Sequence, residues 1–280
     1  MAIFSRNVQA FLLLVGTIVG VGMFGIPFVF VRAGFLTGVV ELAILAVAAA
    51  LVHLAYAEVV LATPELHRLP GYVRHYLGHT AGQASRLSYL VGLSGSLLAY
   101  IVLGGFFLQT LLVAVFPETS PMAGPLIFYA LGLFILFQGI RFESAANGLL
   151  TVVLLGAIVA LALTLLPAAA LPSAAFHPER LPVPYGVILF SMAGAAVIPE
   201  MRRILGRSSG RRLRSLTVLG TFAASLLYLL FTAVVVGVSG LATTPDAITG
   251  LAAHFGAFYL LSGSILGFRT AITSFIPLAM

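Results

Sequence analysis

The sequence predicts an all-α polytopic membrane protein of about eight transmembrane helices, and three observations support this prediction. Hydrophobic residues make up 61% of the 280 residues and charged residues 8%, a composition that excludes an ordinary soluble domain. The apolar residues form continuous runs, which favour helices over the alternating strands of a membrane barrel. Arginines gather on alternate links between these runs, as they do in polytopic membrane proteins.

Each apolar run is near the length of about 20 helical residues that crosses a bilayer. A polar segment, Pro64 to Arg86, separates the second and third runs, and a loop rich in Ala and Pro covers residues 167–184. We expect the eight spans at residues 8–30, 36–62, 87–116, 122–140, 148–166, 185–201, 215–239 and 252–280.

The arginines predict the orientation of the chain. They lie at the N-terminus and on every second link: Arg6, Arg68, Arg74, Arg86, Arg141, Arg202, Arg203, Arg207, Arg211, Arg212 and Arg214. The other links carry only Arg32 and Arg180. The positive-inside rule therefore predicts a multi-pass protein of the plasma (inner) membrane with a cytoplasmic N-terminus. The net charge of +6 follows from this topology, so we expect the lipid bilayer and no nucleic acid among the partners.

The first apolar run contains the stretch GTIVGVGMFGIP, residues 16–27, which is unfavourable for a continuous helix. Glycine costs a helix interior about 1 kcal/mol and proline about 3 kcal/mol. Broken backbone is tolerated in a membrane where it faces protein or a water-filled cavity. The stretch therefore predicts a discontinuous helix that lines a binding site, and close helix packing through the spacing of Gly16 and Gly20 is the alternative.

The sixth span contains a matching interruption. Residues 22–27 read GMFGIP and residues 194–199 read GAAVIP, so both have a glycine five residues before a proline. The predicted topology makes the first span run outward and the sixth inward, as an inverted repeat of five spans requires. We expect one transporter domain over residues 1–280, with a first repeat at 7–167, a partial second repeat at 183–280, and helices one and six broken at the midplane.

These two stretches also carry a family resemblance. GTIVGVGMFGIP resembles the first-helix motif of the amino acid–polyamine–organocation superfamily, in particular its aromatic and hydroxy amino acid permeases and its amino acid/auxin permeases. FSMAGAAVIPEMRR resembles their sixth helix. The resemblance implies the fold of the bacterial leucine–sodium symporter, with ten core helices in two inverted sets of five. The last two core helices are absent, so we expect a truncated chain with an incomplete second repeat.

The resemblance implies a secondary active transporter, not an enzyme, that imports a neutral amino acid by alternating access, with aromatic amino acids among the candidate substrates. A broken helix can hold both charges of an amino acid, with helix N-terminal amides for the carboxylate and free carbonyls for the ammonium. Tyr100, in the third span, is either a neighbour of the substrate side chain or a core tyrosine bonded to a carbonyl. The expected substrate-binding residues are Thr17, Gly20, Val21, Gly22, Tyr100, Phe190, Ser191, Met192, Ala193 and Ala196.

The predicted coupling ion is sodium or a proton, and no other cofactor is expected. In the symporter fold a sodium site combines carbonyls of the first helix with oxygens of the eighth, which here gives Gly16, Val19, Thr270, Thr273 and Ser274. The alternative is that these hydroxyls bond the preceding turn of their own helix. Intramembrane carboxylates are functional by default, so Glu58 and Glu200 are candidates for carrying a proton. A pair between Glu200 and a nearby arginine is the alternative.

Two other functions compete with transport. The motif at residues 92–95, GLSG, together with Ala253-His254 resembles the serine and histidine motifs of rhomboid-type proteases, with Ser94 and His254 as the reacting pair. A non-transporting membrane scaffold or sensor derived from a permease is the second alternative. The absence of cysteine excludes disulfides and thiolate chemistry.

Overall fold

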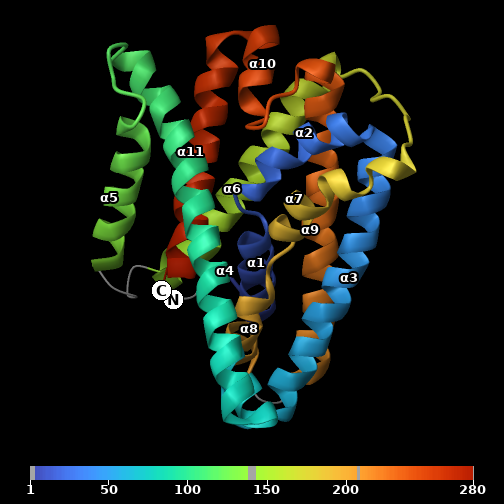
Figure 1. The fold of residues 1–280 in the computed structure, drawn as a ribbon, viewed down its shortest axis with the longest axis vertical. Helices are drawn as coiled ribbons and strands as arrows, with labels where there is room; N and C mark the ends of the chain where they lie inside the picture. The colour runs from blue at the N-terminus through green and yellow to red at the C-terminus, as the bar shows by residue number, and fades with distance from the viewer. Residues whose placement is uncertain (1–3, 138–142, 207–208, 280) are drawn as a thin grey trace.

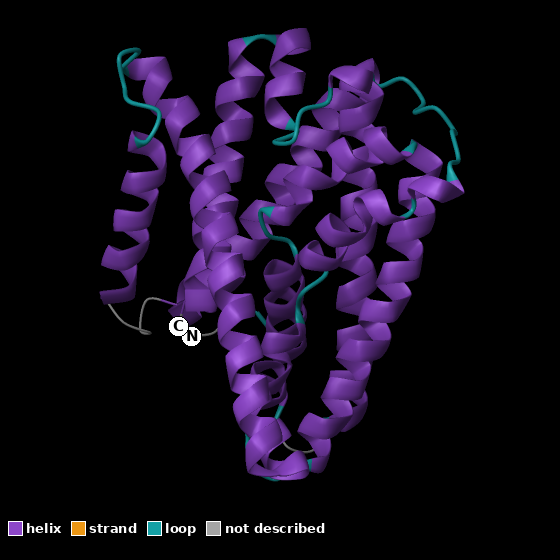
Figure 2. Cartoon of the chain, in the orientation of Figure 1, coloured by secondary structure: helices purple, strands orange, loops and turns teal. Residues whose placement is uncertain are grey.

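The structure, a computed structural model, describes residues 4–137, 143–206 and 209–279. Over these residues the chain is helical, with turns and loops between the helices and no strand (Figure 2). The helices are α1 Arg6–Ile18, α2 Gly22–Ala33, α3 Phe35–Ala62, α4 Leu69–Val115, α5 Ala123–Phe137, α6 Glu143–Leu165, α7 Pro182–Ser191, α8 Ile198–Leu205, α9 Gly210–Ser239, α10 Ile248–Phe255 and α11 Ala257–Ala279.

Helix length and hydropathy confirm an all-α polytopic membrane protein. Among the described residues, five helical segments are long and apolar enough to span a membrane, and α1 with α2 forms a sixth, bent by 47°. These six correspond to the predicted first, second, third, fifth, sixth and seventh spans. The predicted fourth span contains α5 and extends into residues outside the described part of the chain.

The prediction for the eighth span is wrong at its start. We expected one helix from residue 252, but α10 ends at Phe255 and α11 begins at Ala257. Gly256 lies between them with a φ of +76°, a left-handed conformation that glycine adopts without a Cβ clash. The two helices pack on each other, since a Cβ on Gly263 of α11 would lie 2.6 Å from Ile248. The hydropathy of the sequence does not change across this turn, so the apolar pattern did not predict it.

The third span begins earlier than its apolar run. Helix α4 starts at Leu69, inside the predicted polar segment, and changes direction at Gly78, where φ is +84°. Tyr72, in the first part of α4, is buried and packs edge-on against Tyr56 of α3. This contact supplies the apolar anchor that holds a mostly polar helical segment against the bundle.

The two interrupted spans occupy the middle of the bundle (Figure 1). α3 and α9 lie on one side of them, and α4, α11 and α5 lie on the other. One core of buried apolar side chains joins α1, α2, α3, α6, α7, α8, α9 and α10 and takes in single side chains of α4 and α11, and a smaller one joins α4, α5 and α11 to the start of α2. The first interruption is therefore buried in protein, and the second is buried at Met192 and Gly194 but exposed at Ala193 and Ala196. Broken backbone is tolerated at membrane depth where it faces protein or a water-filled cavity.

Candidate functional site

The first interruption lies between Ile18 and Gly22. The amide of Gly20 donates to the Ile18 carbonyl at 2.8 Å, a tight turn that ends α1. Met23 donates to the Gly20 carbonyl at 3.3 Å, and α2 then continues through Pro27 to Ala33. The first amides of a helix have no acceptor in a preceding turn, and they form the positive end of the helix dipole. The start of α2 is therefore an N-terminus in the centre of the bundle.

The second interruption lies between Ser191 and Ile198. Met192 and Ala193 close the end of α7, with their amides donating to Ile188 at 2.9 Å and to Phe190 at 3.2 Å. A short 3₁₀ turn, Ala195–Val197, then leads into α8. These two bonds cap part of the helix end, and the last carbonyls of α7 still point out of it and form the negative end of its dipole. This interruption therefore complements the first in charge.

The two interruptions touch each other at their glycines. A Cβ on Gly22 would clash with the Ser191 hydroxyl and would lie 3.2 Å from the Ser191 Cα. A Cβ on Gly194 would lie 2.5 Å from the Ile18 side chain. Each motif glycine is thus required by close approach of the other broken span. The neighbouring helices α2 and α7 run side by side (Figure 1).

Tyr228 of α9 joins both interruptions. Its side chain is fully buried, and its hydroxyl lies 2.5 Å from the Ile18 carbonyl and 2.9 Å from the Ser191 carbonyl. Because a phenol has one hydrogen to donate, it donates to one carbonyl at a time while contacting the other. Tyr228 therefore fixes the end of α1 relative to the end of α7.

Sequence reasoning missed Tyr228. Its apolar run has no proline, and the two glycines of the run, Gly220 and Gly237, lie eight and nine residues away, so nothing local marked it. A weak signal was available, because Thr217, Thr221, Ser225 and Tyr228 recur at spacings of four, four and three residues. That spacing places all four on one face of a helix. All four side chains are buried in the structure.

The structure brings together one part of the predicted substrate site. Gly20, Val21 and Gly22 are buried at the start of α2, and Phe190 and Ser191 lie against Gly22. Tyr100 is buried and packs in the same small cluster as Val21. The other predicted substrate residues differ in their exposure: Met192 is buried, whereas Ala193 and Ala196 are exposed. The Thr17 hydroxyl donates to the Leu13 carbonyl of its own helix at 2.7 Å.

The predicted sodium ligands are only partly described. Gly16 packs on α6, where its Cβ would lie 2.5 Å from the Thr151 hydroxyl oxygen. Val19 is fully buried at the end of α1. The buried Thr270 hydroxyl donates to the Leu266 carbonyl at 2.7 Å, which is the bond to the preceding turn named as the alternative. The side chains of Thr273 and Ser274 lie outside the described residues.

Both carboxylates that were candidates for proton coupling lie in ion pairs. Glu58 accepts two bonds from Arg214, at 2.5 and 2.8 Å, and both side chains are about half exposed. Glu200 pairs with Arg203, three residues further along α8, as its alternative interpretation requires. These pairs place both carboxylates in a charged environment at one end of the bundle.

Arg202 has a structural contact that the sequence did not reveal. It is buried, and it donates to the carbonyls of Val60 and Thr63 at the end of α3, the latter at 2.6 Å. A cation at a helix C-terminus satisfies the carbonyls that have no partner in the helix and interacts favourably with the dipole. Arg202 therefore anchors α8 to α3.

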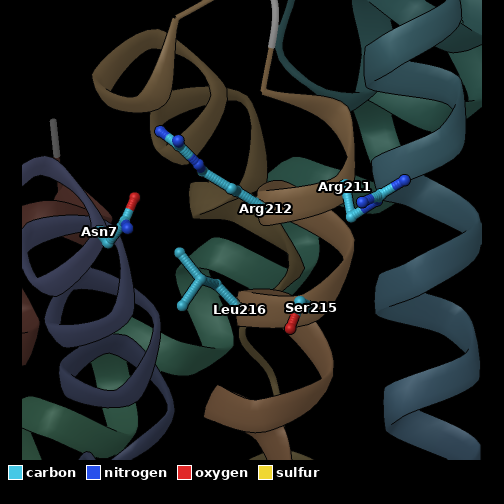
Figure 3. A pocket seen from close by; sticks show the side chains of 5 residues that line it. All are labelled: Asn7, Arg211, Arg212, Ser215 and Leu216. Carbon is cyan, nitrogen blue, oxygen red and sulfur yellow. The ribbon is translucent and has the colours of Figure 1, made fainter.

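Two pockets lie at the arginine-rich end of the bundle, away from the interruptions. The first, about 270 Å³, lies between the starts of α1 and α9, and its residues are drawn in Figure 3: Asn7, Arg211, Arg212, Ser215 and Leu216. The Arg212 side chain extends toward Asn7, whereas Arg211 points the other way, toward α3 (Figure 3). The second, about 410 Å³, is lined by Pro64, Glu65, Leu66, Arg202, Arg203 and Gly206.

The chain is similar to a known permease family. The model of the tryptophan/tyrosine permease family matches residues 5–276, which include both interruptions and Tyr228. No curated protein matches the chain significantly. Permeases are transporters, so the protease interpretation of Ser94 and His254 is wrong; Ser94 lies exposed on α4, and the His254 side chain is outside the described residues. The chain belongs to the tryptophan/tyrosine permease family and is an amino acid transporter of the membrane.

Proposed function

We propose that this transporter imports a neutral aromatic amino acid across the plasma (inner) membrane, with its N-terminus in the cytoplasm. The observation that carries the proposal is the contact between the two interrupted spans, in which Gly22 lies against Ser191. That contact brings a helix N-terminus and a helix C-terminus together inside the bundle. A zwitterion needs both, because burying either of its charges without a partner is prohibitive.

The substrate carboxylate binds at the start of α2, near Gly20, Val21 and Gly22. The Val21 and Gly22 amides are the proposed donors, because the Gly20 amide already donates to the Ile18 carbonyl. These amides supply hydrogen bonds and the positive end of a helix dipole without a charged side chain. The ammonium binds carbonyls at the two ends that precede the interruptions, near Thr17 in α1 and near Phe190 or Ser191 in α7. Small residues at these points let the ligand approach the backbone.

The aromatic side chain of the substrate lies among Tyr100, Met192, Ala193 and Ala196. Tyr100 supports this assignment because it packs beside Val21, next to the amides proposed for the carboxylate. An aromatic ring there gains edge-to-face or stacked contacts in addition to apolar burial. The exposed Ala193 and Ala196 offer small surfaces against which a bulky ligand fits.

Transport proceeds by alternating access, with inverted repeats at 7–167 and 183–280 rocking about the site. This mechanism is typical of transporters with broken helices, and it extends the resemblance to the amino acid–polyamine–organocation superfamily. The coupling ion is sodium, held by Gly16, Val19, Thr270, Thr273 and Ser274, or a proton, for which Glu58 and Glu200 are the carboxylate candidates.

Uptake of labelled tryptophan, tyrosine, phenylalanine and leucine into proteoliposomes tests the proposal. An inward sodium or proton gradient should drive saturable uptake of an aromatic amino acid above the level in protein-free liposomes. Unlabelled aromatic amino acids should compete, and leucine should compete less. Uptake of only charged or small amino acids would refute the aromatic assignment. Binding without uptake would instead support a non-transporting sensor.

A further inference from the structure

A histidine is buried inside the bundle at a position that the proposed site does not use. His53 lies within the membrane-spanning helix α3 and is 3% exposed. Its Nδ1 lies 3.0 Å from the Thr221 hydroxyl oxygen of α9. Ionisable groups inside a membrane are costly, and their side chains usually serve transport pathways. Histidine is also the side chain that titrates near physiological pH.

The hydrogen bonds of Thr221 indicate which nitrogen of His53 is free to take a proton. The Thr221 hydroxyl lies 2.9 Å from the Thr217 carbonyl, to which it donates its single hydrogen. The Nδ1 of His53 is then the donor to the Thr221 oxygen, so the neutral ring carries its lone pair on Nε2. Protonation at Nε2 leaves the bond to Thr221 in place and makes the ring a cation.

His53 is connected to the interrupted spans through α9. The Ser225 hydroxyl donates to the Thr221 carbonyl at 2.9 Å and lies 3.6 Å from the Met192 sulfur, at the end of α7. On the residue before Thr221, a Cβ at Gly220 would lie 2.8 Å from the Leu14 side chain of α1. A shift of α9 that moves Thr221 away from His53 therefore also disturbs the packing at both broken spans.

The described elements that pack on α3 bring no carboxylate to His53. Their titratable and charged side chains are Glu41, Tyr56 and Glu58 of α3, Arg32 of α2, Tyr185 of α7, Glu200, Arg202 and Arg203 of α8, Arg211, Arg212, Arg214 and Tyr228 of α9, and Tyr72, Arg74, His75, Tyr76, His79, Arg86, Tyr89 and Tyr100 of α4. Glu200 is paired with Arg203. Glu58 is five residues along the helix, about 7 Å, and about 140° around it. It is already paired with Arg214. Glu41 is about 18 Å away along the same helix.

We propose that His53 is a proton-binding site that couples protonation to the conformational change of the transporter, an inference that rests on the proposed transport function. In the conformation described here, a charged His53 is buried without a carboxylate, so the neutral ring is favoured. A conformation in which α9 moves and water or an anionic group reaches Nε2 favours the cation. A proton bound in one conformation and lost in the other shifts the equilibrium between them.

The test measures proton entry together with amino acid uptake. Proteoliposomes with an entrapped pH-sensitive dye receive labelled aromatic amino acids at external pH from about 5.5 to 8, the range that brackets histidine titration. The variants are H53Q, which retains an amide donor for Thr221 but cannot titrate, and H79Q, a control at an exposed position of α4. E58Q and E200Q are measured in parallel.

We expect H53Q to lose proton entry coupled to uptake, and H79Q to match the unmodified protein. Proton entry that persists in H53Q, or that disappears in E58Q or E200Q instead, would overturn the proposal. If H53Q does not fold, a comparison of T221V with T221S replaces it, with the pH dependence of uptake as the measured quantity. Loss of the Nδ1 acceptor in T221V should shift the pH midpoint of uptake, whereas T221S should keep it, and identical midpoints would contradict the proposal.

Hydrogen exchange separates this inference from the proposed function. If the unmodified protein transports no aromatic amino acid, the proposed function fails, but His53 can still be examined by amide exchange in α3 and α9. After correction for the intrinsic pH dependence of exchange, acidification should increase opening in the unmodified protein and not in H53Q. Equal pH responses in the two proteins, or no response in either, would overturn the proton site.

Discussion

The hydroxyl of Tyr228 offers the sharpest test of how the two broken spans are held together. The substitution Y228F keeps the buried ring and removes only the oxygen, so it creates almost no cavity. The Ile18 carbonyl retains its bond from Gly20 at 2.8 Å. The Ser191 carbonyl is at the end of α7, where the helix supplies no donor, and it loses the contact at 2.9 Å.

A buried polar group that loses its partner costs about 1–3 kcal/mol. We therefore expect Y228F to lower the free energy of unfolding by about 1–3 kcal/mol. If ligand binding must first restore the relative positions of the two broken spans, the same free energy is lost from binding. We therefore expect the affinity for an aromatic amino acid to fall by about 5- to 150-fold, since 1.4 kcal/mol is a factor of ten.

Reversible unfolding in mixed micelles with increasing denaturing detergent measures the first quantity, and equilibrium binding of labelled tryptophan measures the second. Y185F is the matched control, because Tyr185 of α7 is 49% exposed. It should match the unmodified protein in both assays. Equal unfolding free energies and equal affinities for Y228F and Y185F would refute the role assigned to the buried hydroxyl.

Two further substitutions test the contacts between spans. G22A adds a Cβ that meets Ser191, so we expect it to abolish or strongly reduce uptake. G186A, on the open surface of α7, should leave uptake unchanged. Equal uptake by the two variants would show that the two interrupted spans can move apart without loss of transport. R202Q removes the cation that bonds two carbonyls at the end of α3, and should lower the unfolding free energy by about 2–3 kcal/mol, measured in the same mixed micelles. R203Q, in an exposed ion pair, should change it by less than about 1 kcal/mol, and a similar loss in both variants would contradict the anchoring role of Arg202.

Local features of the sequence correctly predicted the membrane class and the two broken helices. Continuous apolar runs specify spans because of the cost of placing polar groups in lipid, a property of each segment alone. Glycine and proline interrupt a helix through backbone terms that are equally local. The prediction of one continuous eighth span failed for a local reason as well. The chain turns at the single residue Gly256, inside an apolar run whose hydropathy does not change.

The partners of the polar groups were decided only by tertiary structure. Tyr228 reaches Ile18 across 210 residues, and His53 reaches Thr221 across 168. Membrane-spanning helices such as α9 carry apolar residues on their exposed faces as well as on their buried faces, as at Leu219, Phe222 and Leu226, so apolar periodicity does not reveal which face meets which neighbour. The sequence alone determined where the backbone breaks in the first and sixth spans. Helix packing decided which carbonyls, hydroxyls and rings meet there, because those contacts depend on the relative register and angle of separate helices.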